Sequence, residues 1–465
     1  MKKVFSAAAL AVLMWVALAA DAPRPNAKRV REIAGYLADE PGFPDTRITN
    51  RAVWDRLAGG PGAYYVEKAA GIAKEPVPFL DDATYTNIVW GGVSAKRTRN
   101  LNALVYGECL ENKGRFLGRI IEYLDAMCAQ TTWMNPYHDR PNFGNFHGKY
   151  RSVDLNTGES AIDIAMALDC LKGKLPEKTV KRALDALAEF VFTPYLIAAA
   201  DPNAIHNCCS WFFCDSNWNC ACHNQVVSAA LRTVADKWKR AKFVEGAERG
   251  YPFFLAGFSK EGYCQEGIDY WNYGYGEFLR LGLTVRKATA DKGDCFAHPK
   301  ARKCFDYAHD FQLVKWCSPQ FGDGNAAPSD NNFAMGEIVW PETRSDFTRS
   351  CMPVSYGLED CILKIFRPGA LDPKPPAPTF RLPIRTFFAD AQVFLCRPFD
   401  SGLYTLSACI KGGHNGVPHN HNDAGAYVIA LGGTQMVEDP ANQKYDLDTF
   451  GPKRYESKMR NSYGH

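Results

Sequence analysis

The sequence predicts a protein of the α+β class, in which a long helical part precedes a short part made of antiparallel strands. Three observations support this prediction. From about residue 27 to residue 367, apolar residues recur at steps of three and four, the spacing of amphipathic helices. A run with six prolines in 18 residues, 366–383, then interrupts the chain. After it, β-branched and aromatic runs alternate with glycine-rich turns, as in antiparallel sheets.

The bulk composition limits the classes of protein that the chain can belong to. A chain of 465 residues is too long for one compact core, so we expect more than one domain. The hydrophobic fraction of 46% and the charged fraction of 23% are typical of a soluble globular protein. The net charge of +3 is too small to indicate a nucleic-acid partner, and a polyanion would need a local basic groove.

The first 20 residues have the composition of a secretory signal peptide. Two lysines follow Met1, an apolar run extends to residue 20, and Ala17-Leu18-Ala19 is a site that a signal peptidase accepts. The alternative is a membrane anchor, although the run is slightly short to cross a bilayer. We expect no later membrane span. The prediction is a signal peptide over residues 1–20 and a secreted or periplasmic protein.

The helical part, residues 27–367, is expected to form one domain of successive helices. Helix pairs of this kind stack as bundles, solenoids or closed toroids. No fixed sequence period is found, so a simple repeat array is disfavoured. Gly and Pro break the pattern at helix-length intervals. The clearest helical patterns cover residues 114–130, 159–175, 178–196, 225–240 and 276–289.

The proline-rich run predicts a stiff linker over residues 368–383. The segments 384–398, 402–413 and 424–439 then have the composition of strands. The stretch from 384 to 465 is long enough for only a few strands. The sequence thus predicts a small antiparallel β part after the linker.

The chain contains sixteen cysteines, and five of them form a cluster between His206 and His223. Export permits disulfides, so one or two disulfides are one interpretation of the cluster. Buried free thiols and a structural zinc site are the alternatives. The zinc interpretation is the weakest, because no Cys-x2-Cys unit is present. The clustered residues are Cys208, Cys209, Cys214, Cys220 and Cys222.

The segment GGHNGVPHNHNDAGAY, 412–427, concentrates groups that can bind a metal or a sugar. His419 and His421 are two residues apart, so on a strand they would share one face. Asp439 follows the next strand after a two-glycine turn, and a hairpin could bring its carboxylate beside His421. Two histidines and an aspartate are a common zinc ligand set, which His465 would complete. The alternative is a polar turn with hydrogen-bonded histidines.

Several motifs give the chain a resemblance to a known family. The stretches GGHNGVPHNHNDAGAYVIALGG, VEDP, FGPKRYES and NSYGH resemble the C-terminal signature of the heparinase II/III-like polysaccharide lyases. In the helical part, SNWNCACHNQVVSAAL and KEGYCQEGIDYWNYG resemble the same family. The resemblance implies an N-terminal incomplete (α/α) toroid followed by the start of an antiparallel β-sandwich. Family members continue with more strands, so we expect either a fragment or a shortened sandwich.

The resemblance also implies a reaction. Family members cleave acidic polysaccharides by β-elimination, which requires a group that neutralises the uronate carboxylate, a base and an acid. The catalytic tyrosine falls on Tyr270, with Tyr273 as second choice, and Asn217 falls where related lyases neutralise the carboxylate. His419 matches the histidine that reaches the scissile bond, and His223 is a further candidate. The alternatives are core packing for the tyrosines and helix capping for Asn217.

Further roles come from the same resemblance. His421, Asp439 and His465 match the ligands of a divalent metal, which we expect to be a structural Zn²⁺ that fixes the loops of the sheet. Tyr270 and His419 are expected on the two sides of a cleft that holds an acidic polysaccharide. A surface ion pair is the alternative for the arginine among the predicted substrate contacts. These predicted contacts are Trp218, Arg454, Tyr455 and His414.

Two other functions fit parts of the sequence. A glycoside hydrolase on a similar toroid would use paired carboxylates, for which Glu261, Glu266 and Asp269 are candidates. A non-catalytic glycan-binding protein is the second alternative. The sequence does not distinguish a glycosaminoglycan, alginate, ulvan or another uronate as the substrate.

Overall fold

The structure is a computed structural model of the 465-residue chain. The predicted signal peptide and the predicted metal ligand His465 lie outside the residues that it describes. These described residues are 22–59, 61–78, 80–87, 93–324, 327–346, 357–372, 375–399, 405–417, 419–439, 449, 451, 453–456 and 460–461.

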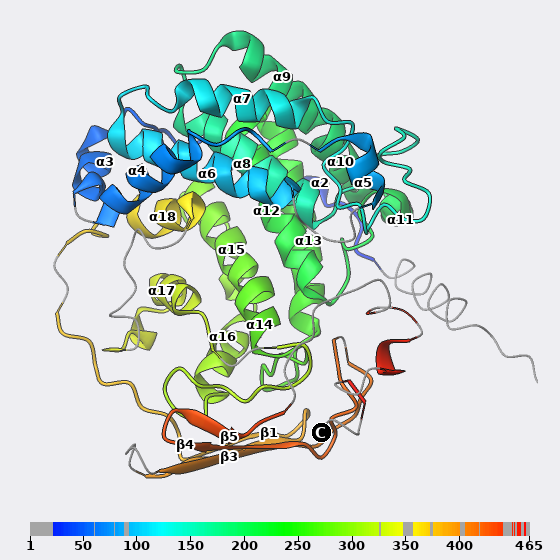
Figure 1. Ribbon diagram of the computed structural model, residues 1–465, viewed down its shortest axis with the longest axis vertical. Helices are drawn as coiled ribbons and strands as arrows, with labels where there is room; N and C mark the ends of the chain where they lie inside the picture. Colours follow the sequence, from blue (N-terminus) through cyan, green and yellow to red (C-terminus); the bar gives the residue numbers. More distant parts are fainter. Residues whose placement is uncertain are drawn as a thin grey trace, which may run out of the picture.

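Helices occupy the chain from Ala27 to Ile365, and the strands follow from Arg385 onward (Figure 1). This order confirms the predicted class, a helical toroid followed by the start of an antiparallel β part. The α-helices are α2 (Ala27–Tyr36), α3 (Arg51–Ala58), α4 (Pro61–Ile72), α5 (Asp82–Asn87), α6 (Val93–Glu111), α7 (Leu117–Cys128), α8 (Leu155–Cys170), α9 (Glu177–Leu187), α10 (Thr193–Ala200), α11 (Ile205–Cys208), α12 (Asn217–Thr233), α13 (Lys237–Ala256), α14 (Ile268–Tyr270), α15 (Gly276–Ala288), α16 (Ala301–Asp310), α17 (Asp330–Val339) and α18 (Leu358–Ile365).

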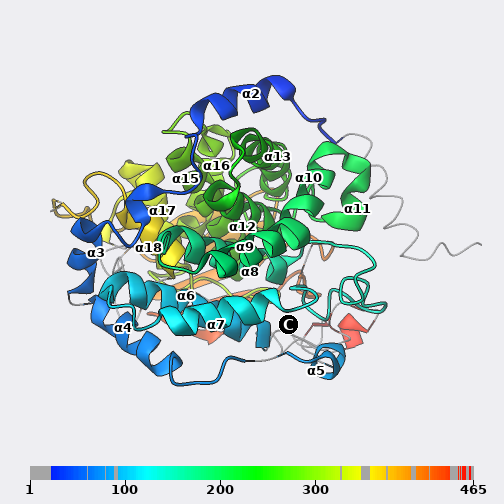
Figure 2. The ribbon, with the colours of Figure 1, turned by 90° about the horizontal axis from the view of Figure 1, so that it is seen from above.

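Helix α12 is the centre of the helical part. Nearly all of its side chains are buried, and it packs against α8, α13 and α15. Figure 2 shows the other helices arranged around it. A helix buried on all sides needs no single apolar stripe, and the amide residues of α12 lie in its first half.

One predicted helix proves to be two. The pattern over 225–240 is broken at residues 234–236, where Asp236 caps the start of α13 by accepting from the backbone N–H groups of Trp238 and Lys239. Such a cap satisfies the donors that a helix start leaves unpaired.

A second correction concerns membrane spans. The stretch Glu177–Ala200 is long and apolar enough to cross a bilayer, contrary to the expectation of no such segment after the N-terminus. However, 56% of its apolar window is buried inside the protein. That burial is the property of a core helix, which passes the same test of length and composition.

The strands form a five-stranded antiparallel sheet in the order β1-β2-β3-β4-β5. The turn between β4 and β5 is a tight hairpin, in which Gly432 has a φ of 58° that favours glycine. The strands are β1 (Arg385–Phe388), β2 (Val393–Cys396), β3 (Leu406–Lys411), β4 (Tyr427–Leu431) and β5 (Thr434–Val437).

The inner face of the sheet packs on the helical part and shares its core. Phe388 contacts Tyr263 and Phe311, with ring centroids 5.1 and 6.3 Å away. Val393 and Leu395 on β2 and Val428 on β4 are completely buried in the same cluster. Because the core is continuous, the sheet has a fixed position relative to the helices.

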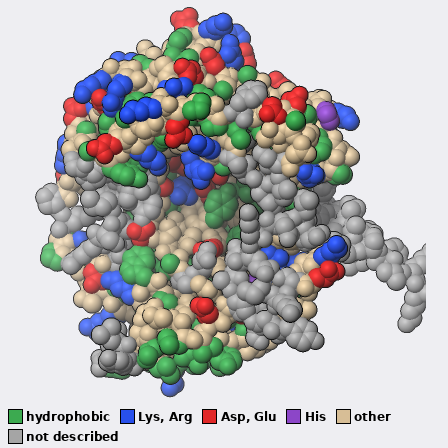
Figure 3. Space-filling model, in the orientation of Figure 1, with side chains coloured by type: hydrophobic (Ala, Val, Ile, Leu, Met, Phe, Trp, Pro, Cys, Tyr) green, Lys and Arg blue, Asp and Glu red, His purple; other side chains and the backbone are tan. Residues whose placement is uncertain are grey.

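The outer face of the sheet is apolar and exposed. Phe387, Phe394, Ile410 and Tyr427 lie opposite one another on four neighbouring strands, and each is at least 36% exposed. Figure 3 shows hydrophobic side chains gathered over the sheet, at the lower end of the molecule. In a closed β-sandwich an apolar face of this kind would be covered by a second sheet, whereas here it is exposed.

The cysteines of the described chain are free thiols, so the disulfide interpretation of the cluster between His206 and His223 is wrong for those residues. Cys209, Cys220 and Cys222 are completely buried, and burial raises the pKa of each thiol well above its usual range. They therefore act as small apolar core residues.

Candidate active site

Tyr270 and His419 lie in contact at the junction of the helical part and the sheet. The two rings are stacked, with centroids 3.9 Å apart and planes inclined by 15°. Tyr270 ends the short helix α14, and His419 lies in the loop between β3 and β4, so residues 149 positions apart meet here. Stacking places both rings on the same side of any sugar that they contact, which differs from the expected placement on two sides of a cleft.

Glu266 joins two of the predicted site residues, Asn217 and His419. Its Oε2 accepts a hydrogen bond from Asn217 Nδ2 at 2.9 Å and lies 2.8 Å from His419 Nδ1. The side chain is buried. The sequence predicted Glu266 only as an acid of the alternative hydrolase. Its role as a connection between the toroid and the histidine loop was missed, because the three residues are far apart in sequence.

Local backbone geometry brings Asn217 close to the turn that follows Tyr270. Asn217 is the first residue of α12, and Ser216 precedes it as the N-cap residue. A π-helical turn, Trp271–Tyr275, follows Tyr270. A Cβ on Gly274 in this turn would lie 2.8 Å from the Cβ of Asn217, so only glycine allows the approach. Because Ser216 is the N-cap residue and the side chain of Asn217 donates to Glu266, the helix-capping alternative for Asn217 is wrong.

His419 and His421 lie in a loop, and the prediction that they share one face of a strand is wrong. The backbone of His419 has a φ of 53°, which is in the left-handed region. The loop therefore turns between the two histidines and directs their rings to different partners, Glu266 and Asp323. Non-glycine residues in this conformation carry strain of order 1 kcal/mol or more, and such residues concentrate at functional sites.

His421 belongs to a buried charge cluster that holds the loop in place. Asp323 accepts from Arg454 Nη2 at 2.9 Å and lies 2.9 Å from His421 Nε2. Burial opposes ionisation of the Asp323 carboxyl, but the hydrogen bonds from His421 and Arg454 outweigh it and lower its pKa to about 2. The carboxylate is thus ionised at neutral pH and ties the loop to the toroid.

Two residues that were predicted to contact the substrate, Arg454 and Tyr455, help to hold this loop in place. Arg454 also donates to the backbone carbonyls of Asn420 and Thr449, and it is only 9% exposed. Tyr455 donates its hydroxyl to Asn420 Oδ1 at 2.6 Å. The guanidinium of Arg454 is therefore occupied within the protein, and we correct its role from binding substrate to positioning the loop.

The predicted zinc site is not formed by the residues described. Within them, no group of three or more His, Cys, Asp or Glu side chains is placed to hold a metal. His421 Nε2 faces Asp323 instead, and Asp439 is buried. His465 is outside the described chain. The metal thus stays a prediction.

The groups that affect the hydroxyl of Tyr273 are different from the contacts of Tyr270. Burial and the neighbouring Glu277 carboxyl raise the pKa of the Tyr273 hydroxyl well above its usual range. Two tyrosines three residues apart would share a face of a regular α-helix, but the π-helical turn begins between them and changes their relative direction.

His223 is a core residue and is withdrawn from the candidate site. It is completely buried, with Nδ1 2.9 Å from the Tyr195 hydroxyl and Nε2 3.1 Å from the carbonyl of Phe212. Burial lowers its pKa to about 3. A Cβ on Gly250 would lie 2.0 Å from its Nε2, which shows how closely the core surrounds it.

The remaining candidates are spread around the junction. His414 is exposed and accepts a hydrogen bond from the N–H of Gly416 in its own turn. Glu261 is half-buried and accepts from Ser259 Oγ at 2.9 Å. Trp218 is half-buried and lines a cavity beside the cluster.

The cluster provides the groups that acid–base chemistry needs. An ionised Glu266 can only accept hydrogen bonds, so His419 donates from Nδ1 and its Nε2 is the nitrogen that can accept a proton. The phenol of Tyr270 is the second proton-carrying group. A nearby sugar would thus meet one imidazole and one phenol from the same side.

The comparison with solved structures defines the class of fold. The toroid of helices followed by an antiparallel sheet is the fold of a polysaccharide lyase, over the part of the chain that the comparison covers. The crystal structure of heparinase III is similar to this chain with a TM-score of 0.51 and 13% identity, over 79% of this chain and 53% of that chain.

Other solved structures are similar at a lower TM-score. They include a heparinase III (BT4657 gene product), at 0.49 and 13% identity over 82% of this chain and 58% of that one. The chondroitin AC lyase of Streptomyces coelicolor A3 in complex with chondroitin sulphate has a TM-score of 0.49 and 13% identity, over 82% and 55%. The chain thus spans little more than half the length of these proteins. No family model and no curated protein matches the sequence.

Proposed function

We propose that the protein is a polysaccharide lyase that cleaves an acidic, uronate-containing polysaccharide by β-elimination. One observation carries this proposal: the Tyr270 phenol is stacked on the His419 imidazole, while Glu266 connects His419 to Asn217. The similarity of the fold to the solved structure of heparinase III supports it.

The chemistry assigns one role to each group. A base removes the proton at C5 of the uronate, the electron pair forms the C4–C5 double bond, and the bond from C4 to the bridging oxygen breaks. His419 Nε2 takes the C5 proton and the Tyr270 hydroxyl gives its proton to the leaving oxygen. Glu266 takes only one N–H of Asn217, and we assign the other to the uronate carboxylate.

The stacked rings add a stereochemical expectation. Since both groups approach from one side, the C5 proton and the C4 oxygen must lie on the same face of the sugar. The proposed reaction is therefore a syn elimination. A polysaccharide whose uronate has the opposite configuration at C5 should be cleaved more slowly than its epimer.

The substitution Tyr270→Phe tests the proposal. Elimination leaves an unsaturated product that absorbs ultraviolet light, whereas hydrolysis leaves none, so absorbance separates the two reactions. General acid–base catalysis contributes about 10²- to 10⁴-fold, so we expect kcat to fall by that factor with KM nearly unchanged. If the natural chain binds acidic polysaccharides but never forms an ultraviolet-absorbing product, the protein is a glycan-binding protein and the proposal fails.

A further inference from the structure

Two carboxylates from different helices meet in the interior of the helical part. Asn224 Nδ2 on α12 donates to Glu277 Oε2 at 2.8 Å and to Glu359 Oε1 at 3.3 Å. Since one amide nitrogen reaches both groups, Glu277 and Glu359 are neighbours, and we call them the carboxylate pair. Their helices, α15 and α18, pack against each other (Figure 1). Asn224 is completely buried, Glu277 is 8% exposed, and 15% of the Glu359 side chain is exposed.

A single guanidinium lies among three carboxylates at this point. Arg280 Nη1 is 3.1 Å from Glu277 Oε1, and Arg280 Nε is 2.8 Å from Asp360 Oδ1 but 3.9 Å from Glu359 Oε2. Burial opposes ionisation of Asp360, but the charge of Arg280 outweighs it and lowers the pKa of that carboxyl. The guanidinium is therefore used first by Asp360, and Glu359 receives the weakest share of it.

Two further cations near the pair do not balance its charge. Lys364 on α18 favours ionisation of Asp360 by its charge. Arg232 on α12 forms an ion pair at 3.1 Å with another carboxylate, Asp169. With Arg280 and Lys364 both counted, three ionised carboxylates would still leave one negative charge in excess at this place in the described chain.

Helix α8 adds acids to the surroundings of the pair. Asp163 accepts from Asn102 Nδ2 at 2.9 Å, and burial raises the pKa of the Asp163 carboxyl well above its usual range. Burial, followed by the charge of Asp154, raises the pKa of Glu159 to about 6, although the exposed Arg99 opposes this shift. The negative charge of these acids disfavours ionisation of both members of the pair.

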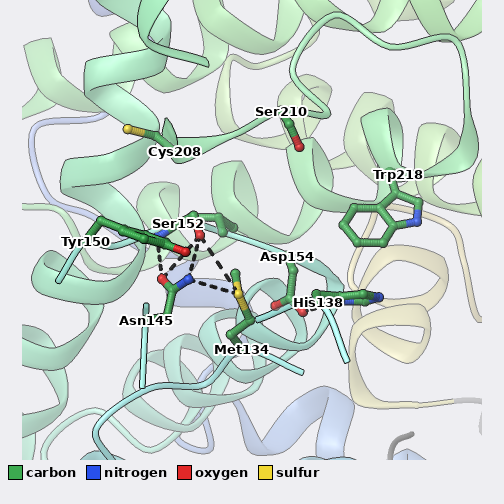
Figure 4. Close-up of a pocket in the computed structure, with 10 residues that line it drawn as sticks. Met134, His138, Asn145, Tyr150, Ser152, Asp154, Cys208, Ser210 and Trp218 are labelled. Carbon is green, nitrogen blue, oxygen red and sulfur yellow. Dashed lines mark hydrogen bonds and ion pairs between the residues drawn. The ribbon is translucent and has the colours of Figure 1, made fainter. Parts of the chain in front are cut away.

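Asp154 shows how this chain stabilises a buried carboxylate that is ionised. Figure 4 shows His138 next to it, with Nδ1 2.7 Å from Asp154 Oδ2. The N–H groups of Asn135 and Thr157 and the hydroxyl of Thr157 also donate to it. Burial opposes its ionisation, but these bonds outweigh burial and hold its pKa below the usual value. Among the described residues, Glu359 accepts only the shared amide bond, which is far less than a buried carboxylate needs.

We propose that Glu277 and Glu359 share one proton in the folded protein at neutral pH, and that this proton holds α18 against α15. A protonated carboxyl needs no cation and does not repel its ionised neighbour. In agreement, burial, followed by the charge of Glu277, raises the pKa of the Glu359 carboxyl to about 8. At higher pH both groups are ionised, and their repulsion weakens the packing of α18. The pair is thus an alkaline-sensitive switch in the helical part, separate from the proposed elimination.

Hydrogen exchange of the α18 amides, Leu358–Ile365, tests the switch. The pKa of Glu359 is raised from 4.5, so its proton contributes stability that is complete below pH 4.5 and lost as the pH rises to 8. One pH unit corresponds to a factor of up to about ten. After correction for intrinsic exchange rates, we expect protection of wild-type α18 to fall at least tenfold between pH 6 and pH 9. Glu359→Gln keeps the shape without the ionisable group, so its protection should change by less than about threefold.

Glu122→Gln is the matched control, because Glu122 lies on α7 with 58% of its side chain exposed. This variant should keep the pH dependence of the wild type. Equal loss of protection in the wild type and in Glu359→Gln would overturn the proposal, as would wild-type protection that is unchanged up to pH 9. If Glu359→Gln does not fold, Glu277→Gln provides the same comparison, since it also leaves a single acid at the shared amide. No substrate is needed, so the result does not depend on the proposed function.

Discussion

The substitution Glu266→Gln tests the central connection of the candidate site. The carboxylate accepts from Asn217 at 2.9 Å and lies 2.8 Å from His419 Nδ1, so the change keeps the shape and removes the charge. Glutamine can accept one bond but no longer dictates which nitrogen of His419 carries the proton. A fraction of His419 would then present a protonated Nε2, which cannot act as a base.

The magnitude follows from the bond that is lost. A hydrogen bond to a charged group contributes about 1.5–3 kcal/mol, and about 1.4 kcal/mol corresponds to a factor of ten in rate. We therefore expect kcat to fall about 10- to 150-fold, as measured from the initial rate of ultraviolet-absorbing product. KM should change less, because the tautomer of His419 affects the proton-transfer step more than the binding of substrate.

Glu261→Gln is the matched control, because Glu261 lies in the same segment and its carboxylate bonds to Ser259 outside the cluster. This variant should keep the wild-type kcat. A Glu266→Gln variant with wild-type kcat would refute the role assigned to the carboxylate. A fall in melting temperature of more than about 6 °C would indicate instead that Glu266 mainly stabilises the fold, since about 1–2 kcal/mol should shift it by only a few degrees.

Three further predictions concern stability and association. The folded pKa of His223 is about 3, below its ordinary 6.5. The free energy of unfolding should therefore fall by about 1.4 kcal/mol per pH unit as the pH is lowered from 6.5 to 3. His223→Gln should flatten this slope in denaturant titrations. The pKa of Asp323 is lowered to about 2, so the contribution of this carboxylate to folding stability is present above pH 4 and lost as the pH falls through 2. Asp323→Asn should therefore lower the melting temperature at pH 7 more than at pH 2. Ile410→Lys on the outer sheet face should reduce self-association, measured by light scattering, without changing the melting temperature by more than a few degrees.

Periodicity predicted several helices well, because burial on one face leaves a direct record in the sequence, whereas the segments 384–398 and 424–439 each proved to contain two strands. The segment 276–289, for example, matches α15. The fold class followed from this order and from the resemblance. Helix α12 was harder to delimit, since a helix buried on all sides carries amides such as Asn217 and Asn224 where periodicity expects apolar residues.

The candidate site was predicted only in part, for reasons of geometry. Motifs identified Tyr270 and His419, and the structure brings their rings into contact. The central role of Glu266 was missed, because its partners lie 49 and 153 residues away. His223 was selected from its position near Asn217, but a sequence neighbour on a buried helix can point into the core. The available signal was the pair Glu266-Gly267, an acid directly before a glycine that could form an unusual turn. In the structure Gly267 does have a φ of 94°.

The charge cluster and the proposed chemistry depend on each other through one loop. His419 keeps a left-handed backbone, which costs free energy unless surrounding contacts fix it. One contact does so: the N–H of Asp323 donates to the His419 carbonyl at 3.2 Å. Glycine at position 322 leaves room for this approach, because a Cβ there would lie 2.9 Å from that same oxygen. The Asp323 carboxylate also binds Arg454 and His421, so one short toroid segment holds the loop from both sides. The buried ion cluster therefore helps to position the imidazole against Tyr270, in the site that we propose for the sugar.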